Sequence, residues 1–341
     1  MDHGAGTQKL LEVCEAWGLK GIATFLFSAC IGKKVLRFTK ETVLLGEVVG
    51  EGAYAFVYKA ESSSTGAQYA VKMIFLHDAT YEESAQQEVM AYKTFQHGNM
   101  LQMLDCLEAE NDEGQRVMYL LFPFQEQGNL RQALDARLNN PGLIPRPPLT
   151  SVLRSFRGVC EVVNMLHSHE PRYVHFDLKP DNVLISDESE PLLMDFNSVR
   201  VAEVTVETRS DALGLSEAAA SFCTVSYRAP ELFDPPKGVT VDTRTDVWAL
   251  GCLLFAWWFG YSPFECEFSE VGRPRVVECS SLRVLSEVPA PPNPTADDKV
   301  ILELVHWILQ KDFSIRPYTT DVLERLDECI VKYGGKGGGV K

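Results

Sequence analysis

Two hydrophobic patterns divide the chain near residue 128. From Val43 onward, apolar and aromatic residues alternate with polar ones, for example at Tyr54, Val57 and Tyr69. Alternation with a period of two is typical of β-strands with one buried face. Beyond Gly128 the apolar positions recur every three to four residues, which is typical of helices. We therefore expect a small β-rich part followed by a larger helical part.

One segment interrupts the β-rich part. Residues Tyr81–Phe95 are rich in Glu and Gln and predict a helix. Strand-like sequence returns at Met100–Leu107 and Val117–Phe124. The predicted order is therefore strands, one helix, then strands.

Four helices are predicted in the second part. Val152–His167 has one apolar face of a 3.6-residue repeat, and Asp246–Gly260 is apolar nearly all round, as in a helix buried inside a domain. Leu302–Leu309 and Val322–Ile330 are further helices, and Pro289–Pro294 is a proline-rich connector.

Composition narrows the class of protein. The 341 residues are 45% hydrophobic and 23% charged, as in a globular protein. The formal net charge of −15 argues against nucleic acid as a partner, because phosphate binding needs clustered Lys and Arg. Nine cysteines without Cys-x-x-Cys spacing predict free thiols in a reducing compartment. No apolar stretch reaches 18 residues, so no membrane-spanning helix is expected.

A glycine-rich segment and a lysine follow each other in the β-rich part. Gly50–Val57 predicts a strand–turn–strand loop whose backbone amides can approach a phosphate, although by itself it better fits an ordinary hairpin. Lys72 ends an apolar strand, where an unpaired charge is costly, so it needs an anion. Glu88 on the predicted helix is the candidate partner. The alternative is a lysine that reaches solvent from an edge strand.

The strongest chemical signal lies between His175 and Asp195. A carboxylate at Asp177 can accept a hydroxyl proton, which typically contributes about 10²–10⁴-fold to a rate. Lys179 can hold a transferring phosphate, and Asn182 and Asp195 supply the oxygen ligands that magnesium prefers. The lysine at its expected offset and the second aspartate 18 residues after Asp177 make coincidence remote.

In their order along the chain, these motifs resemble the signature set of eukaryotic protein kinases. The resemblance covers roughly residues 43–330 and includes Ala229-Pro230-Glu231 and a late arginine, Arg316, which it pairs with Glu231 as a buried brace. It implies an α+β, two-lobed protein-kinase-like fold, with a small β-rich N-lobe of five strands and one helix and a larger helical C-lobe. The implied domains are an N-terminal extension (1–40), a kinase domain (41–331; N-lobe 41–122, hinge 123–128, C-lobe 129–331) and a Gly-rich flexible tail (332–341).

The resemblance also implies site roles. Catalysis is assigned to Asp177 and Lys179, and metal binding to Asn182 and Asp195. The residues expected to contact ATP are Gly50, Glu51, Gly52, Ala53, Val57, Ala70, Lys72, Glu88, Phe122, Pro123, Gln125 and Asn182. The implied activation segment contains Thr224, Ser226 and Glu231. The implied cofactors are ATP and Mg²⁺ or Mn²⁺.

The sequence before Glu231 narrows the resemblance. Cys223–Phe233 and Ala212–Ala219 resemble the numb-associated kinase family, and within it the serine/threonine kinase 16 type. Members carry a helical insertion in the activation segment, and Leu215–Phe222 has the composition for one. By the same resemblance, Lys179 and Thr224 imply Ser/Thr rather than Tyr specificity.

Two residues depart from the family pattern. Phe176 replaces the arginine that normally receives an activation-loop phosphate. We therefore hypothesise that the enzyme is active without loop phosphorylation, because the activation segment is ordered by its own helix. The alternative that Phe176 only fills a pocket under the loop is compatible with this hypothesis. Asn197 replaces the glycine after Asp195-Phe196, and we expect it to adopt the left-handed conformation that this turn requires.

Some conspicuous residues are expected to be structural. His175 is predicted to hold the loop against Phe196, and Trp257 and Trp258 to lie in the core. Cys223 is expected to be an unreactive thiol.

The N-terminal segment leaves two interpretations open. Its apolar run, Ile22–Ile31, is too short to span a bilayer and lacks the flanks of a signal peptide. Kinases of the resembled type begin Met-Gly and are myristoylated, whereas Met1-Asp2 excludes that lipid. An acyl chain on Cys30 would give peripheral membrane contact. Alternatively, the segment forms a short helix that packs on the small lobe.

These observations predict a serine/threonine kinase that phosphorylates proteins, itself included. The expected partners are ATP and protein substrates, not nucleic acid. The expected location is cytoplasmic, and the family resemblance suggests Golgi or other secretory-pathway membranes. The alternative is a catalytically weak, ATP-binding pseudokinase scaffold, against which the retention of every catalytic and metal-binding residue argues.

Overall fold

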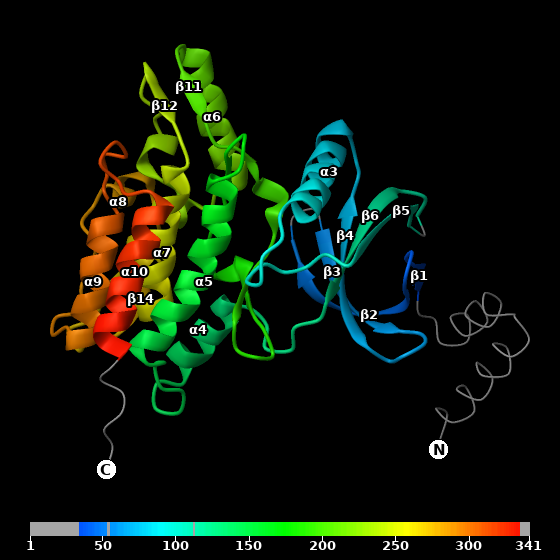
Figure 1. Cartoon of the computed structure of the whole chain (residues 1–341), viewed down its shortest axis with the longest axis horizontal. Coiled ribbons are helices and arrows are strands. Elements are labelled where there is room, and N and C mark those ends of the chain that lie inside the picture. The colour runs from blue at the N-terminus through cyan, green and yellow to red at the C-terminus, as the bar shows by residue number, and fades with distance from the viewer. Residues whose placement is uncertain (1–33, 53–54, 112, 335–341) are drawn as a thin grey trace, which may run out of the picture. The chain divides into compact units, whose positions relative to one another are not determined.

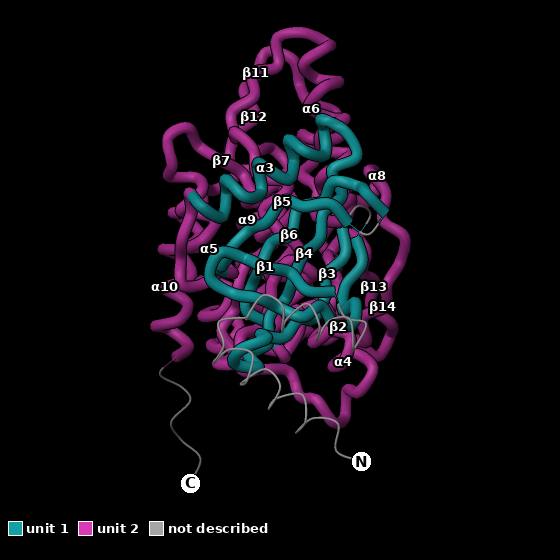
Figure 2. Tube along the Cα trace, turned by 90° about the vertical axis from the view of Figure 1, so that its right-hand side faces the viewer, with its two compact units in different colours: residues 1–93, 102–125 teal, residues 94–101, 126–341 magenta. Residues whose placement is uncertain are grey.

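The computed structural model describes residues 34–52, 55–111 and 113–334, and these form two compact units (Figure 1 and Figure 2). The small unit contains the described residues up to Lys93 together with Gln102–Gln125. The large unit contains Thr94–Leu101 and the described residues from Glu126 onward. The first is rich in strands and the second in helices, so the expected α+β class is confirmed.

The small unit is built on a six-stranded antiparallel sheet and one helix, α3 (Ala79–Thr94). The strand order is β1-β2-β3-β4-β6-β5. The strands are β1 Val35–Arg37, β2 Thr42–Glu51, β3 Ala55–Ser62, β4 Gln68–Phe75, β5 Asp105–Glu110 and β6 Arg116–Pro123.

The prediction of a five-stranded sheet is wrong, because the sheet has one additional strand, β1. Val35 lies opposite Leu44 in the register of β1 and β2, and the turn between them is closed by a 2.8 Å hydrogen bond from the Phe38 amide to the Glu41 carbonyl. Leu36 and Phe38 bury their side chains on the sheet, which accounts for the added strand. The sheet therefore begins within the segment 1–40 that was expected to be an extension.

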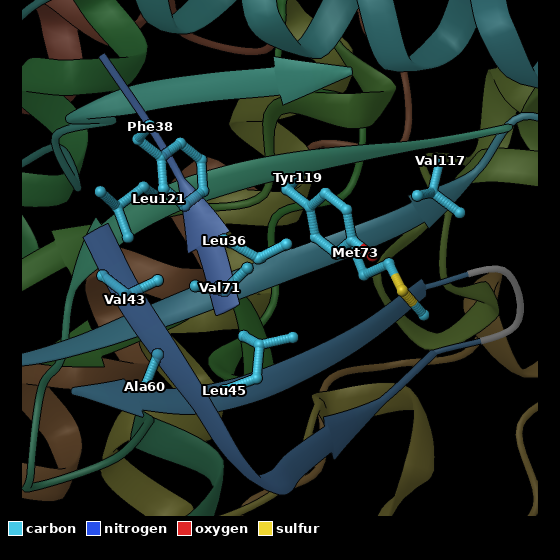
Figure 3. Close-up of a cluster of buried hydrophobic side chains, with 10 residues drawn as sticks. All are labelled: Leu36, Phe38, Val43, Leu45, Ala60, Val71, Met73, Val117, Tyr119 and Leu121. Carbon is cyan, nitrogen blue, oxygen red and sulfur yellow. The ribbon is translucent and has the colours of Figure 1, made fainter. Parts of the chain in front are cut away.

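The two faces of this sheet have different neighbours. Cross-strand register places Phe56, Met73 and Tyr119 side by side, and they share one face. Lys72 and Leu120 project from the opposite face, which α3 covers. Figure 3 shows the buried cluster on the first face, which also includes side chains of β1 and β2.

The predicted strand Met100–Leu107 is only partly confirmed. Strand β5 begins at Asp105, whereas Met100 and Leu101 belong to the large unit. Met100 makes an isolated bridge to Leu193, and the Leu101 amide donates to the Leu193 carbonyl at 2.9 Å. Both apolar side chains are buried, which explains why this stretch has the composition of a strand.

The large unit is mainly helical. Its helices are α4 Leu130–Asn139, α5 Leu149–His167, α6 Arg209–Phe222, α7 Arg244–Phe259, α8 Ser281–Val284, α9 Ala296–Ile308 and α10 Thr319–Gly334. The four predicted helices correspond to α5, α7, α9 and α10. Helix α5 packs against α7 and α10, and α7 packs against α9 (Figure 1).

Helix α7 lies at the centre of the large unit, as its sequence predicts. All residues from Thr245 to Phe259 are buried, including Trp257 and Trp258. The helix ends at Gly260, whose φ of 111° is left-handed, and a Cβ there would lie 2.8 Å from a methyl group of Leu138. Over the described residues, no helix is both long and apolar enough to cross a bilayer.

Four short antiparallel pairs shape the loops of the large unit. They are β7 Tyr173–Val174 with β10 Arg200–Val201, β8 Val183–Ile185 with β9 Pro191–Leu193, β11 Val204–Val206 with β12 Val239–Val241, and β13 Cys266–Phe268 with β14 Pro274–Val276. The first two pairs flank the loops that carry the predicted catalytic and metal-binding residues.

Candidate active site

The glycine-rich segment joins β2 to β3. Gly50 lies opposite Val57, and the Gly52 amide donates to the Ala55 carbonyl at 2.8 Å. Ala55, at the position of the usual third glycine, opens β3 and pairs with Ile74 of β4. Glu51 is exposed, whereas the predicted ATP contact Ala53 lies outside the described residues.

Lys72 and Glu88 form the predicted ion pair. The Lys72 ammonium donates to both carboxylate oxygens of Glu88, at 2.8 and 2.9 Å. The Glu88 side chain is 1% exposed and that of Lys72 is 16% exposed, so both charges are largely withdrawn from water. Removing one partner of such a pair leaves an uncompensated buried charge. Lys72 is therefore fixed by α3, and the alternative of a solvent-reaching lysine is excluded.

Further predicted ATP contacts share the sheet face of Lys72. Val57 and Lys72 are register partners, and so are Ala70 and Phe122 two residues away. Phe122 is buried, with its ring 5.1 Å from that of Tyr92 on α3. Pro123 ends β6 and is followed closely by Gln125, the last residue of the small unit.

Asp177 is the centre of a hydrogen-bond network in the large unit. Its Oδ1 accepts from the hydroxyl of Thr224 at 2.8 Å and from the Thr224 amide at 3.1 Å. Its Oδ2 accepts from the Lys179 ammonium at 2.7 Å and from the amide nitrogen of Asn182 at 3.2 Å. Lys179 also donates to the Thr224 hydroxyl at 3.0 Å. The structure thus brings together two predicted catalytic residues, one metal-binding residue and one activation-segment residue.

Asp246, at the start of α7, anchors the backbone of this loop. It accepts hydrogen bonds from the amides of His175 and Phe176, at 2.6 and 2.9 Å. His167 lies 3.1 Å away on the same carboxylate and is bonded in turn to Thr319 at 2.7 Å. Asp246 was predicted only as part of a buried helix, and this role was not predicted. An acidic residue at the start of an otherwise apolar helix was the available signal.

The second predicted metal-binding residue, Asp195, follows the β8–β9 hairpin. The Met194 amide donates to the Asn182 carbonyl at 2.9 Å, which fixes the two loops against each other. His175 has the predicted structural role of holding the loop against Phe196. Its ring lies 5.1 Å from that of Phe196, and its Nε2 is 3.2 Å from the Met194 carbonyl.

The expectation of a left-handed Asn197 is wrong. The left-handed residue of this turn is Asp195, with φ 64° and ψ 70°, whereas Asn197 lies inside the short 3₁₀ helix Phe196–Ser198. Asp tolerates the left-handed region for the same reason as Asn, because its short polar side chain can bond to nearby backbone. The left-handed residue therefore lies two positions earlier than predicted, and no glycine is needed at position 197.

Phe176 is also left-handed, with φ 72°, and its ring is buried. The Arg200 guanidinium lies 4.3 Å from the centre of this ring and 4.2 Å from the centre of the Phe222 ring at the end of α6. Its Nε donates to the Ser198 carbonyl at 2.9 Å. Burial lowers the pKa of Arg200. The position of this arginine between two rings was not predicted from the sequence.

The predicted helical insertion of the activation segment is confirmed as α6, which begins earlier than predicted, at Arg209. Thr208 caps it, accepting from the Asp211 amide, while Asp211 accepts from the Thr208 amide. These hydrogen bonds from Thr208 lower the pKa of Asp211. A complete capping box of this kind stabilises the start of a helix.

The segment after α6 is held to the large unit at several points. Ser226 is buried, and the Arg228 guanidinium donates to the Cys223 carbonyl at 2.8 Å. Glu231 receives two hydrogen bonds from Arg316, at 2.6 and 2.9 Å, and both side chains are buried, as predicted. Burial raises the pKa of the Cys223 thiol, in agreement with an unreactive cysteine.

Asn182 and Asp195 are the two residues predicted to bind a metal. Within the described part of the chain, no cluster of three or more His, Cys, Asp or Glu side chains could hold a metal alone. The amide nitrogen of Asn182 donates to the Asp177 carbonyl at 2.7 Å, so its carbonyl oxygen points elsewhere. Asn182 and Asp195 both carry oxygen atoms of the kind that a hard cation such as magnesium prefers, so their chemistry fits the predicted metal site.

Comparison with known proteins gives a consistent result. Residues 44–326 match the family described as protein kinase domain. The chain is 33% identical over 282 residues to serine/threonine-protein kinase 16 of Homo sapiens, covering 82% of this chain and 87% of that protein. It is 31% identical to the protein of the same name from Rattus norvegicus, covering 83% and 89%. A probable serine/threonine-protein kinase of Dictyostelium discoideum is 28% identical, covering 84% and 93%.

Proposed function

The chain belongs to the protein kinase family, and we propose that it is a serine/threonine kinase that phosphorylates protein hydroxyls, including its own, with ATP. One observation supports this most directly. The carboxylate of Asp177 accepts hydrogen bonds on both oxygens from residues of the predicted site, Lys179 on one side and Thr224 on the other. We also propose that the enzyme is a non-specific protein serine/threonine kinase.

Asp177 is proposed to accept the proton of the attacking hydroxyl. The hydrogen bonds to Oδ1 and Oδ2 fix the plane of its carboxylate, so that a substrate hydroxyl meets an oriented base. Lys179 would neutralise charge on the phosphoryl group in transfer. Because its ammonium also bonds to Thr224, the activation segment and the catalytic loop are positioned together.

ATP with a divalent cation supplies the phosphoryl group and neutralises its negative charge. Asn182 and Asp195 would hold the cation, for which we propose Mg²⁺ or Mn²⁺. Lys72 would bind phosphate oxygens, oriented for this by Glu88. The other predicted ATP contacts, among them Val57 and Ala70, are proposed to complete the nucleotide site.

We further propose that activity does not depend on phosphorylation of the activation segment. In kinases with an arginine before the catalytic aspartate, a phosphate on the segment supplies the opposite charge. Here Phe176 occupies that position, and Arg200 lies between its ring and that of Phe222. The cation is therefore Arg200 rather than the residue before Asp177. The rings of Phe176 and Phe222 take the place of the phosphate that would otherwise contact an arginine. A desolvated cation–π contact of this kind contributes about 2 kcal/mol.

The relatives named serine/threonine-protein kinase 16 support a narrower proposal. We propose that the chain belongs to the numb-associated kinase family, with helix α6 as the helical insertion expected of its members. On that basis we propose a role on Golgi or other secretory-pathway membranes.

The test is transfer of radiolabelled phosphate from ATP with Mg²⁺ to the full-length chain and to a generic acceptor protein. Asp177→Asn is the diagnostic variant, and Asp187→Asn, on the exposed turn between β8 and β9, is the matched control. Phosphoserine and phosphothreonine that are lost in Asp177→Asn and kept in Asp187→Asn support the proposal. Folded wild-type protein that binds ATP without transferring phosphate would instead favour the pseudokinase scaffold.

A further inference from the structure

The segment between Thr224 and Glu231 carries an arginine, Arg228, whose positive charge is largely withdrawn from water. The residue is 8% exposed, and its guanidinium lies 4.9 Å from the centre of the Phe233 ring. Its Nη2 donates to the Cys223 carbonyl at 2.8 Å. Its Nε is enclosed and has no hydrogen-bond partner among the described residues. A buried cation is costly unless an anion compensates it.

The described residues supply no anion for this guanidinium. Arg316, which is also buried, donates to both carboxylate oxygens of Glu231, whereas Arg228 forms no ion pair within the described chain. Burial lowers the pKa of Arg228, and the thiols of Cys223 and Cys279 are the groups whose charge would influence it. Burial raises the pKa of both thiols, that of Cys279 to about 11, so neither is ionised near pH 7.

One part of the guanidinium remains open to an approaching group. Nη1 of Arg228 has no hydrogen-bond partner among the described residues and, unlike Nε, is not enclosed. An anion can therefore reach Nη1 from solvent. Carboxylate and phosphate are the anions that a guanidinium recognises best, because its planar donors match their oxygens.

Arg228 also lies close to the proposed base. The Cys223 carbonyl that it contacts belongs to the same peptide unit as the Thr224 amide, which donates to Oδ1 of Asp177 at 3.1 Å. One peptide unit and two hydrogen bonds therefore separate Nη2 from Oδ1, a distance of at most about 8 Å. Neighbouring Cα atoms of a bound peptide are about 3.8 Å apart. A side chain one or two residues from the reacting hydroxyl can therefore reach Arg228.

We propose that Arg228 is a specificity-determining residue that binds an acidic side chain of the protein substrate, within two residues of the hydroxyl that is phosphorylated. The inference rests on the proposed kinase function and names its substrate class. That class is proteins with Asp, Glu or a phosphorylated residue beside the target serine or threonine. The acid at Nη1 supplies the negative charge that the described fold omits, in a charge-assisted hydrogen bond.

Steady-state phosphorylation of matched peptides by the full-length chain tests the proposal. Each peptide has one target serine and carries Glu, Gln or phosphoserine at one of the four positions within two residues of it. We expect kcat/KM to be about 10-fold higher or more for Glu than for Gln at one position, the effect of a hydrogen bond to a charged group. A further rise with phosphoserine would identify phosphorylated proteins as the source of the anion. Equal values for the three residues at every position would overturn the proposal.

Variants of Arg228 assign the preference to this side chain. Arg228→Gln should reduce the ratio of the Glu to the Gln kcat/KM to about 1, whereas Arg228→Lys should retain part of it because the cation remains. A purely structural defect lowers both values equally and leaves the ratio unchanged. Arg273→Gln, on the exposed connection between β13 and β14, is the matched control and should keep the wild-type ratio. A wild-type ratio in Arg228→Gln would show that another residue binds the acid.

Phosphatase treatment of the enzyme, followed by removal of the phosphatase, separates a substrate acid from a phosphate on the chain's own activation segment. The same preference for Glu before and after treatment supports the proposal. A preference that appears only after treatment would assign Arg228 to the chain's own phosphate and overturn it. Transfer to the Glu and Gln peptides alike would overturn this inference alone, whereas no transfer to any peptide would overturn the proposed function with it.

Discussion

The hydroxyl of Thr224 donates a 2.8 Å hydrogen bond to Oδ1 of Asp177, while the Lys179 ammonium reaches both residues, at 2.7 Å from Oδ2 and 3.0 Å from the hydroxyl. The three side chains come from two segments more than forty positions apart. The orientation of the proposed catalytic base therefore depends on the position of the activation segment. Removing the Thr224 hydroxyl should change the surroundings of the Asp177 carboxylate while leaving Asp177 itself intact.

We predict that Thr224→Ala lowers kcat, whereas Thr224→Ser retains most of it. A hydrogen bond to a charged group contributes about 1.5–3 kcal/mol, which corresponds to a loss of about 10- to 100-fold. Steady-state phosphorylation of a protein acceptor provides the measurement. Equal losses in the Ala and Ser variants would show that the methyl group, and not the hydroxyl, is what matters.

The contact of Arg200 with the rings of Phe176 and Phe222 is predicted to replace the usual contact between an arginine and the activation-loop phosphate. Phosphatase treatment should leave wild-type activity intact, while Arg200→Met should lower it by about 10-fold or more, the equivalent of one desolvated cation–π contact of about 2 kcal/mol. Arg200→Lys should recover part of the loss because it keeps the cation. Phe222→Leu should add little to Arg200→Met, since both remove the same contact.

Arg172→Met is the matched control for this series. Its guanidinium pairs with Glu203 at 3.4 Å, and both side chains are about half exposed. Exposed pairs contribute about 0–1 kcal/mol, so activity should be nearly unchanged. Inactivation of the wild type by phosphatase would refute the role given to Arg200.

The buried brace between Glu231 and Arg316 is predicted to govern the stability of the large unit. Its side chains are 3% and 0% exposed, and Arg316 donates to both oxygens of Glu231. Glu231→Gln leaves the guanidinium without its charge partner and should lower the free energy of unfolding by about 3–5 kcal/mol. Urea denaturation is the measurement. Glu303→Gln, from the exposed pair with Arg325, should cost no more than about 1 kcal/mol.

The two buried ion pairs were predicted in different ways. Lys72 ends an apolar strand, where an unpaired charge is costly, whereas the partner of Arg316 was implied by the family resemblance. Both predicted partners, Glu88 and Glu231, are those observed. The long helices were predictable because their apolar periodicity extends over several turns.

The contacts of Asp246 and Arg200 could not be predicted in this way. Asp246 is recognised by backbone amides about seventy positions earlier, and an amide leaves no signature in the sequence. Arg200 contacts aromatic rings rather than a carboxylate, so a search for an oppositely charged partner does not find these contacts. Strand β1 was missed because three residues are too few for an alternating pattern.

The left-handed turn was misplaced for a more general reason. A missing glycine identifies a loop that needs unusual backbone, but not the residue that adopts it. Asn197 was expected to be left-handed by comparison with the family pattern, whereas Asp195 takes that conformation. Sequence alone could not determine which of these two residues, separated by Phe196, does so, because Asn and Asp both tolerate the left-handed region.

Asp298 is predicted to make the large unit sensitive to acid. Burial alone would raise the pKa of this carboxyl, but hydrogen bonds from Trp258 at 2.7 Å and from the Thr295 amide at 2.9 Å, together with Arg146 at 2.7 Å, hold its pKa below the ordinary value of 3.8. A pKa that is lower in the folded state means that the ionised form stabilises the fold. That stability is fully present above the unfolded-state pKa and is lost as the pH falls through the folded-state value.

The expected result follows from this sign. In urea titrations from neutral pH downward, the free energy of unfolding of the wild type should decline more steeply below about pH 4 than that of Asp298→Asn, which has no proton to take up. Near pH 7 the variant should be the less stable of the two, because its amide cannot replace the charge that faces Arg146. Asp297→Asn, exposed on the same first turn of α9, should follow the wild-type curve. Parallel curves for the wild type and Asp298→Asn across the acid range would show that Asp298 is not the group responsible.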